Sequence, residues 1–516
     1  MNWGRELSAM RDRYGERIGI VDIEGRHTTA SVVDRAAGIA RRLQDLGLGP
    51  GDFVATIFKN SALAAAASYG VALAGATEVP INPVLSEAEI DHALRCTGTR
   101  IILLDGAAGP ALSVDVPVED VRAIAPRTLV PEGWPDVVDN EPSRIVFTSG
   151  TTGPAKGAIH THRSRWIASL MLRAALPILP GGNSRILLMT PFSHGSSLLT
   201  FAYLAEGASV HLMQGVDPAV ILPLLAEGEL TEMFAPPTVL AKLTEALARP
   251  EHASVTPKLK TILTGTAPLS PTLYRNAVNA FGEIIRVTYG KSEIFNPITV
   301  LDPAETAAVY AELPGEGLCI GWPVSGVEVA IRDDEGKPLP RGEIGQIHLA
   351  SPHMFTGYVT VNGRKMLAPG EYHDTGDLGR IDDCGRLFLV ARDSDMMKSG
   401  GYKIAPDEVE RALAPALPGT ELVALGFPSE YWGEIVTVVA QRPPDGWRDD
   451  LKDALSAMTS YKRPRLFVAI DEVPRNAIGK ISRAHLRRWL NETYDLVEKP
   501  HPTFVAKAAV LAENQR

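Results

Sequence analysis

The stretch from Arg144 to Gly157 reads Arg-Ile-Val-Phe-Thr-Ser-Gly-Thr-Thr-Gly-Pro-Ala-Lys-Gly. It begins with a short apolar run of strand-forming residues. The ten residues from Thr148 onward hold three glycines, four hydroxyl side chains and one lysine. Glycines let backbone N–H groups approach an anion closely, and hydroxyl and ammonium groups add donors and charge. The stretch is therefore typical of a strand that runs into a polyphosphate-binding loop.

The loop does not have Walker A spacing, because no Gly-Lys-Ser/Thr follows its first glycine in register. An ordinary turn rich in glycine and threonine is the alternative that composition allows. The run from Thr148 to Gly157 closely resembles the signature of the adenylate-forming superfamily: acyl- and aryl-CoA ligases, peptide-synthetase adenylation domains and beetle luciferases. The resemblance implies that this loop binds ATP, and Thr148 is also a candidate magnesium ligand. The implied ATP-binding residues of the loop are Thr148, Ser149, Gly150, Thr151, Thr152, Gly153 and Lys156.

The bulk composition narrows the class of protein. The chain has 516 residues, a net charge of −10 and 45% hydrophobic residues, which is ample for large buried cores. The acidic balance argues against nucleic-acid or membrane binding and favours small-molecule partners. Three widely spaced cysteines indicate neither a disulfide framework nor a paired-cysteine metal site, so we expect a reducing cytoplasm. The longest apolar run, 62–76, is short and interrupted for a membrane-spanning helix.

Strand-like and helical patterns alternate on both sides of the loop. Buried-type strands are predicted at 51–57 and 100–105, with an Ala-rich helix that Ser61 can cap and a helix from Ser86 to Leu94 between them. Alternation in steps of this size indicates βαβ units and mainly parallel sheets. From Gly317 onward, short alternating strands and Gly/Pro turns predict a small antiparallel β-subdomain. The predicted fold class is therefore α/β, with parallel sheets flanked by helices.

A strand predicted at 185–190 ends at Pro-Phe-Ser-His-Gly, which places His194 just beyond it. Taken alone, such a histidine is more often a satisfied core residue than a functional one. The segment resembles the family's Pro-x-x-His block, in which the imidazole or an aromatic ring borders the acyl pocket. Many relatives have glycine three residues after that histidine, whereas this chain has Ser197.

The segment Thr261 to Thr264 stops at Gly-Thr-Ala-Pro, the kind of strand end at which open α/β sheets bind ligands. A plain strand-end turn is equally compatible with this segment taken singly. It resembles the family's Gly-Ala-Pro segment, which contacts adenine and the acyl group. The resemblance implies nucleotide contacts through Thr266, Ala267 and Pro268. The implied residues of the acyl pocket are His194, Ser197, Thr238, Thr264, Gly265, Thr266 and Phe295, and His194 is also a candidate catalytic residue.

Residues 289–293 read Tyr-Gly-Lys-Ser-Glu. An aromatic face can stack on a flat base, and a glutamate four residues later can hold a divalent cation against phosphate oxygens. Taken alone, these would be a core aromatic at a turn and a solvated carboxylate. The run resembles the family's Tyr-Gly-x-Thr/Ser-Glu. The resemblance implies that Tyr289 stacks on adenine beside Gly290, that Ser292 lies near the α-phosphate, and that Glu293 holds magnesium and is catalytic.

The polar segment 391–404 contains paired glycines and leads into a helix start at Pro406, which is typical of a domain junction. We therefore expect an N-terminal adenylation domain at 1–393 and a smaller, mobile α+β domain at 394–516. The family's pivot position, usually Asp or Lys, is Ser394 here, and serine also tolerates loop conformations.

Further roles follow from the resemblance alone. It implies that Asp377 binds the ribose hydroxyls, that Arg392 reaches ribose or phosphate, and that Lys480 is a catalytic residue that enters the site during adenylation. It also implies a coenzyme A channel bordered by Ser399, Gly400 and Gly401.

The function implied is an ATP- and Mg²⁺-dependent carboxylate:CoA ligase, which forms an acyl-adenylate with release of pyrophosphate and then an acyl-CoA with release of AMP. Delivery of the adenylate to an amine or a carrier-protein thiol, activation of nitrite, a non-catalytic ATP-binding regulator and a luciferase-like oxygenase are the alternatives. No acidic residue lies beside His194 to pair with an α-ammonium group, which disfavours amino acids. We expect an aromatic, alicyclic or medium-chain acid, and a monomer or homodimer.

Overall fold

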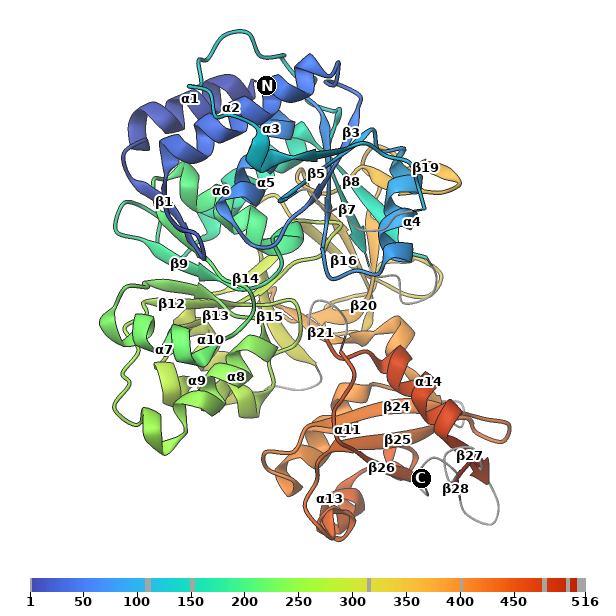
Figure 1. Ribbon diagram of the computed structural model, residues 1–516. Helices are drawn as coiled ribbons and strands as arrows, with labels where there is room; N and C mark the ends of the chain where they lie inside the picture. Colours follow the sequence, from blue (N-terminus) through green and yellow to red (C-terminus); the bar gives the residue numbers. More distant parts are fainter. Residues whose placement is uncertain are drawn as a thin grey trace. The chain divides into compact units, whose positions relative to one another are not determined.

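The chain, drawn as a ribbon in Figure 1, divides into two compact units. Each unit has its own hydrophobic core. Unit 1 comprises Met1–Leu313, Ile320–Glu328 and Leu349–His373, and unit 2 comprises Pro314–Cys319, Val329–His348 and Asp374–Arg516. The predicted boundary between residues 393 and 394 stays a prediction. The computed structural model describes residues 2–106, 113–148, 154–312, 317–399, 402–475, 480–497 and 502–507.

One sheet of unit 1 carries the strands on both sides of the predicted phosphate loop. Among the described residues its strand order is β19-β18-β8-β7-β4-β3-β5-β6. The strands from β7 to β6 in this order run parallel, as predicted, whereas β8, β18 and β19 add antiparallel pairings at the other edge. The bounds are β3 (Phe53–Ile57), β4 (Thr77–Ile81), β5 (Ile101–Leu104), β6 (Val118–Asp120), β7 (Pro142–Thr148), β8 (Lys156–Thr161), β18 (Gly357–Thr360) and β19 (Gly363–Met366).

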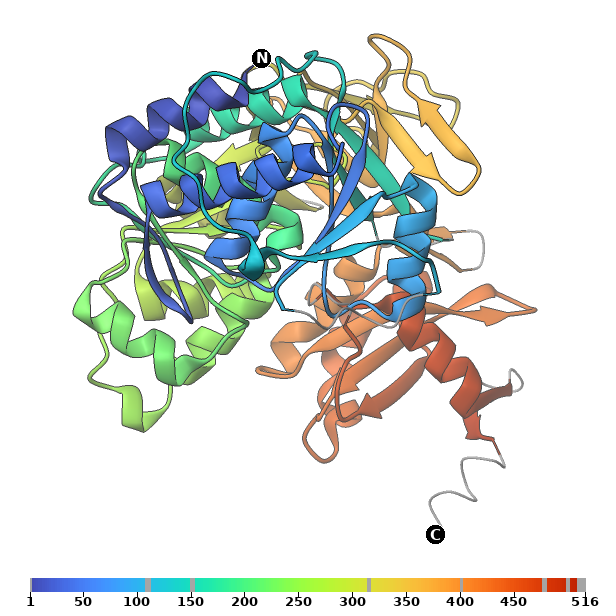
Figure 2. The ribbon, with the colours of Figure 1, turned by 45° about the horizontal axis from the view of Figure 1, so that its top comes forward.

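Helices α3 and α4 begin where the sequence predicts. The Ser61 hydroxyl accepts a hydrogen bond from the backbone N–H of Ala64, and Ser86 forms a reciprocal capping box with Glu89. Figure 2 shows α1 and α2 side by side, and both contribute to one large core with α3, α5 and α6. Within the described ranges, every helix is too short or too polar to span a bilayer. The bounds are α1 (Trp3–Tyr14), α2 (Thr29–Asp45), α3 (Ala62–Leu73), α4 (Glu87–Thr97), α5 (His162–Ala175) and α6 (Ser197–Ala205).

A second sheet crosses unit 1 in the order β2-β1-β10-β9-β11-β12-β13-β14. Its strands are parallel from β1 to β13, so β9, β12 and β13 end at one edge. The three segments singled out in the sequence after strands follow these ends, as expected for ligand sites in open α/β sheets. The bounds are β1 (Ile18–Asp22), β2 (Gly25–Thr28), β9 (Arg185–Leu188), β10 (Ser209–Leu212), β11 (Glu232–Phe234), β12 (Thr261–Thr264), β13 (Ile285–Tyr289) and β14 (Thr299–Leu301).

Four further helices belong to this part of unit 1. In Figure 1 they gather beside β12 and β13, where α8 packs on α9 and α10 on β13. Strand β15 (Leu318–Pro323) pairs with β14 through its last two residues. The helix bounds are α7 (Pro218–Glu227), α8 (Pro237–Leu247), α9 (Pro271–Phe281) and α10 (Pro303–Glu312).

Unit 2 contains two groups of short paired strands. Strands β16, β17, β20 and β21 are neighbours in that order, and β23-β22-β25-β24 form another sheet with β26 parallel to β25. Helices α11 and α14 pack on β24. The bounds are β16 (Glu328–Arg332), β17 (Gly345–Ala350), β20 (His373–Ile381), β21 (Leu387–Arg392), β22 (Met397–Ser399), β23 (Tyr402–Ile404), β24 (Leu422–Ser429), β25 (Gly433–Gln441), β26 (Leu466–Ile470), β27 (Tyr494–Val497), β28 (Thr503–Ala506), α11 (Pro406–Leu413), α12 (Trp447–Asp450), α13 (Lys452–Ala457) and α14 (Arg483–Thr493).

Candidate active site

Lys156 and Glu293, which the sequence assigns to phosphate and to magnesium, are brought together by a third side chain. Tyr358 lies on β18 beside β8, and its hydroxyl donates a hydrogen bond of 2.8 Å to Oε1 of Glu293. The Nζ atom of Lys156 lies 5.8 Å from the centre of the Tyr358 ring. The backbone N–H of Phe355 also donates to the Glu293 carbonyl, at 2.8 Å. A cation and a carboxylate from distant segments thus gather around one aromatic ring.

The sequence reasoning missed Tyr358. Its position depends on the antiparallel register that places Tyr358 opposite Ala158, and the two residues are far apart in the chain. No local pattern encodes such a pairing, because the hairpin β18-β19 looks like any other pair of short strands. The only available signal is the aromatic residue after Phe355-Thr-Gly, which by itself is a strand residue.

The segment from Ser292 to Phe295 is fixed by buried histidines. Nε2 of His160 donates to the Ser292 carbonyl at 2.8 Å, and the His160 ring stacks on Phe295 with centroids 3.7 Å apart. Nε2 of His353 donates to the Phe295 carbonyl at 2.9 Å. Burial lowers the pKa of His160 to about 3 and that of His353 to about 4, so both rings are neutral donors. The backbone that carries Glu293 is therefore held on both sides.

The ends of β12 and β13 approach each other closely. A Cβ atom on Gly265 would lie 2.5 Å from the Thr288 carbonyl oxygen, so only glycine fits there. Tyr289 is buried, and Thr266 has a φ of 71°, which is uncommon for a residue other than glycine and recurs at ligand sites. The Thr264 hydroxyl is buried without a hydrogen-bond partner among the described residues. The candidate adenine and acyl residues therefore share one strand-end edge, with a hydroxyl available for a ligand.

The segment that carries His194 is held by hydrogen bonds with the side chain of Asn60. The side chain of Asn60 accepts from the Phe192 N–H at 2.7 Å and donates to the Thr190 carbonyl at 2.9 Å. Ser197 is buried, and its hydroxyl donates to the His194 carbonyl at 2.7 Å, which closes the turn before α6. The hydroxyl at this position therefore supports the loop backbone, where many relatives have glycine. Thr238, the remaining acyl-pocket candidate, lies in the first turn of α8 and is partly buried.

The remaining predicted residues belong to unit 2. Asp377 and Arg392 face each other across β20 and β21, with Nε of Arg392 3.5 Å from Oδ1 of Asp377. Ser399 ends β22 and is buried, and Lys480 is partly exposed beside the short bridge from Arg475 to Ile481. Gly400 and Gly401 lie outside the described residues, as do the loop residues Ser149, Gly150, Thr151, Thr152 and Gly153.

The oxygen atoms of Glu293 and Thr148 are of the kind that magnesium binds. Glu293 is partly buried, and its Oε2 has no hydrogen bond or ion pair among the described residues. The hydroxyl of Thr148 donates to the carbonyl of Lys156 at 3.3 Å and is partly exposed. In the described part of the chain no cluster of three or more His, Cys, Asp or Glu side chains forms a metal site. Magnesium needs none, because it usually takes one or two carboxylates together with waters and substrate phosphates.

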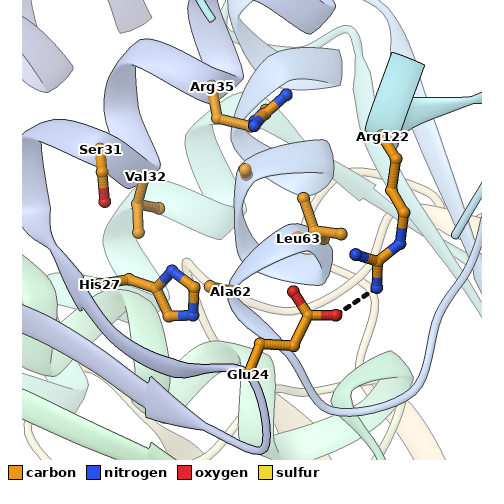
Figure 3. A pocket seen from close by; sticks show the side chains of 9 residues that line it. Glu24, His27, Ser31, Val32, Arg35, Ala62, Leu63 and Arg122 are labelled. Carbon is orange, nitrogen blue, oxygen red and sulfur yellow. Dashed lines mark hydrogen bonds and ion pairs between the residues drawn. The ribbon is translucent and has the colours of Figure 1, made fainter. Parts of the chain in front are cut away.

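A cavity of about 240 Å³ lies near the first hairpin of unit 1, between α2 and α3 (Figure 3). Arg122, at one side of it, forms ion pairs with Glu24 and Asp105. No residue assigned to ATP, the acid or coenzyme A lines this cavity. Its lining residues are Glu24, His27, Ser31, Val32, Arg35, Ala62, Leu63, Ala66 and Arg122.

A comparison of the sequence with models of known protein families identifies the family of this chain. The family model of AMP-binding enzymes matches residues 8–359, which include Lys156, Glu293 and Tyr358. The chain belongs to the family of AMP-binding enzymes.

Relatives of this AMP-binding enzyme are similar over almost their whole length. The fatty acid–(acyl-carrier-protein) ligase ScoC of Streptomyces coeruleorubidus is 31% identical over 507 residues, which cover 90% of this chain and 92% of that protein. The feruloyl-CoA synthase of an Amycolatopsis species is 30% identical over 488 residues, which cover 89% of this chain and 93% of that protein.

A solved structure shows the same fold. The o-succinylbenzoate coenzyme A synthetase MenE from Bacillus subtilis, in complex with ATP and magnesium ion, matches with a TM-score of 0.78. It is 25% identical, and the match covers 94% of this chain and 99% of that one. The predicted α/β fold with a large and a smaller unit is thereby confirmed for this AMP-binding enzyme.

Proposed function

We propose that this AMP-binding enzyme is an ATP-dependent carboxylate:CoA ligase. The observation that carries the proposal is the grouping of Lys156, Tyr358 and Glu293 beside the ends of the parallel strands. A carboxylate and ATP are both anions, so their reaction needs cations fixed where they meet. The ammonium of Lys156 supplies one, and Glu293 is placed to hold another.

The reaction has two steps. A carboxylate oxygen attacks the α-phosphorus of ATP, the bond from that phosphorus to the bridging oxygen breaks, and pyrophosphate leaves. The thiol sulfur of coenzyme A then attacks the acyl carbon, the bond to the AMP oxygen breaks, and the thiol proton passes to solvent. Magnesium, when bound, would neutralise part of the phosphate charge.

Residue roles in the first step follow from position and donor type. Tyr289 and Gly290, with Thr266, Ala267 and Pro268, would contact adenine at the shared strand-end edge. Ser292 would bind near the α-phosphate, and Thr148 with Glu293 would hold magnesium. The loop residues 149–153 are proposed for the phosphates on the basis of their sequence. The acid would lie against His194, Ser197, Thr238, Thr264, Gly265 and Phe295.

In unit 2, Asp377 and Arg392 would bind ribose and phosphate, and Lys480 would stabilise the charge that develops at the α-phosphorus. Fixed donors of this kind are typically worth about 10²–10³ in rate. A domain rearrangement at Ser394 would then exchange Lys480 for the Ser399 loop, which borders the thiol channel. This hinge and its boundary remain part of the proposal.

The acid is proposed to be aromatic, alicyclic or medium-chain. The sequence offers no carboxylate beside His194 for an α-ammonium group. The feruloyl-CoA synthase relative supports an aromatic acid, and the fatty acid ligase relative supports an aliphatic one. The same two relatives differ in the thiol named, so a carrier-protein thiol is the second candidate acceptor.

A pyrophosphate-release assay tests the proposal. Benzoate, ferulate, cyclohexanecarboxylate and octanoate are each supplied with ATP and Mg²⁺, first alone, then with coenzyme A, then with a phosphopantetheinylated carrier protein. We expect acid-dependent pyrophosphate release and stoichiometric acyl-CoA. Transfer to the carrier protein without coenzyme A consumption would establish the second candidate, and no release with any acid would refute adenylation of this substrate class.

Lys480→Ala is the control for the first step. It should abolish adenylation and spare thioester formation from a synthetic acyl-adenylate. Equal loss of both half-reactions would contradict the role given to Lys480.

A further inference from the structure

Three charged side chains are buried behind the segment that carries His194. Glu78 on β4, Arg144 on β7 and Arg165 on α5 expose 1%, 3% and 4% of their surface. Glu78 accepts hydrogen bonds from the hydroxyls of Thr56 at 3.0 Å and Ser68 at 2.7 Å. Nη1 of Arg144 lies 3.2 Å from Oε2 of the same carboxylate. We name Glu78, Arg144 and Arg165 the buried charge cluster.

Burial of the three charged groups of this cluster costs desolvation free energy. Arg144 pairs directly with the Glu78 carboxylate, and burial lowers the pKa of Arg144 as well as that of Arg165, the latter to about 10. Nη2 of Arg165 donates to Ser68 at 3.0 Å. Replacing a buried ion pair by apolar residues is often neutral or stabilising, so such a pair is weak evidence of a stability role. We therefore look for the role of the cluster in how it positions the residues that it contacts.

The cluster contacts the loop at 190–197 by two routes. Nη2 of Arg144 donates to the carbonyl of Ser193 at 3.4 Å, directly before His194. The Arg165 guanidinium lies 5.0 Å from the centre of the Phe201 ring. The Phe201 ring meets Phe192 edge-on, with centroids 6.0 Å apart. One contact thus reaches the loop backbone and the other reaches its aromatic side chain.

We infer that Arg144, oriented by Glu78, is a positioning residue that fixes the Ser193–His194 backbone and so sets the acid-binding wall from behind. The inference rests on the proposed function in one respect only, namely that His194 borders the pocket for the acid. The two terminal nitrogens of the planar Arg144 guanidinium contact different groups: Nη1 lies against the Glu78 carboxylate, and Nη2 donates to the Ser193 carbonyl. A lysine at this position can keep the charge pair but cannot span both acceptors in the same way.

The first test measures hydrogen exchange, which needs no substrate. Arg144→Lys and Arg144→Met are compared with the control Arg173→Met. In the native protein Nη1 of Arg173, on α5, lies 2.5 Å from Oε1 of Glu206, at the C-terminal end of α6. We expect amides 192–197 to exchange about ten-fold faster in both Arg144 variants, because a typical hydrogen bond is lost. The Arg173 variant should leave this peptide unchanged. Unchanged exchange in Arg144→Lys, or equal acceleration in the Arg173 variant, would overturn the inference.

The second test separates positioning from general destabilisation. With the acid that gives the fastest pyrophosphate release, Arg144→Lys should raise KM for the acid by about ten-fold while KM for ATP changes little, because only the acid side is displaced. Equal changes in both constants would contradict the assignment. If the wild-type enzyme released no pyrophosphate with any acid, the proposed function would fail, whereas the exchange result would still decide the positioning role.

Discussion

At the scale of single residues, the Tyr358 hydroxyl is the contact that joins the two predicted phosphate-side groups. Tyr358→Phe removes the hydrogen bond that the Tyr358 hydroxyl donates to the Glu293 carboxylate. Hydrogen bonds to charged groups are worth about 1.5–3 kcal/mol, so we expect a loss of about 10- to 100-fold in kcat/KM for ATP. The loss should be accompanied by a higher Mg²⁺ requirement in the pyrophosphate assay.

Tyr372→Phe is the matched control, because the hydroxyl of Tyr372 also donates to a glutamate of unit 1, Glu328, but on an exposed surface. It should retain wild-type kinetics. Equal losses in the two variants would show that the Tyr358 hydroxyl has no special role.

The same scale shows where sequence reasoning reaches its limit. Lys156 and Glu293 stand in local motifs, so their types and spacing could be interpreted directly. Tyr358 and His160 could not be assigned, because each acts on a distant segment: Tyr358 and Glu293 are 65 positions apart, and His160 and Ser292 are 132 positions apart. Their roles depend on register and stacking, which a single sequence does not encode.

At the scale of elements, helix α4 begins with a capping box. Ser86 accepts from the Glu89 N–H at 3.4 Å, and the Glu89 carboxylate accepts from the Ser86 N–H at 2.9 Å. Ser86→Ala removes one half of this box and should cost about 1 kcal/mol, visible as a lower urea midpoint. Ser456→Ala, whose hydroxyl only returns to the Lys452 carbonyl in an exposed helix, is the control and should change little. A larger effect at Ser456 than at Ser86 would contradict this account of α4.

Elements held by local signals were predictable, whereas sheet assembly was only partly so. The cap of α3, the start of α4 and the apolar runs of β3 and β5 are local features, and the structure confirms them. The hairpin β18-β19, which the sequence analysis did not single out, extends the sheet that contains β7 and β8. Pairing between β18 and β8 depends on long-range contacts, for which neither strand carries a recognisable pattern.

At the scale of the whole molecule, buried histidines make folding sensitive to acid. Burial lowers the pKa to about 3 for His160 and His162 and to about 4 for His211 and His353, from an ordinary value of 6.5. Between those values the unfolded chain binds more protons than the folded one. Stability is therefore fully present above pH 6.5 and falls as the pH drops, with up to about 1.4 kcal/mol per pH unit for each histidine.

Urea denaturation at pH 7.5, 6.5 and 5.5 measures this slope. His162→Gln should make the pH dependence shallower, because it removes one group that is buried neutral. His485→Gln changes an exposed histidine and should leave the slope as in the wild type. Stability that stays constant or rises between pH 6.5 and 5.5 would contradict the prediction.

The central claim is that the groups around Tyr358 serve one ATP and one carboxylic acid. Acid-dependent ATP–pyrophosphate exchange, measured for the wild type and for Glu293→Gln, tests it most directly, because the substitution removes only the charge of the carboxylate. We predict exchange that requires the acid in the wild type and falls by about 10²-fold or more in the variant. Exchange of equal rate in the two proteins, or exchange that does not depend on any acid, would contradict the claim.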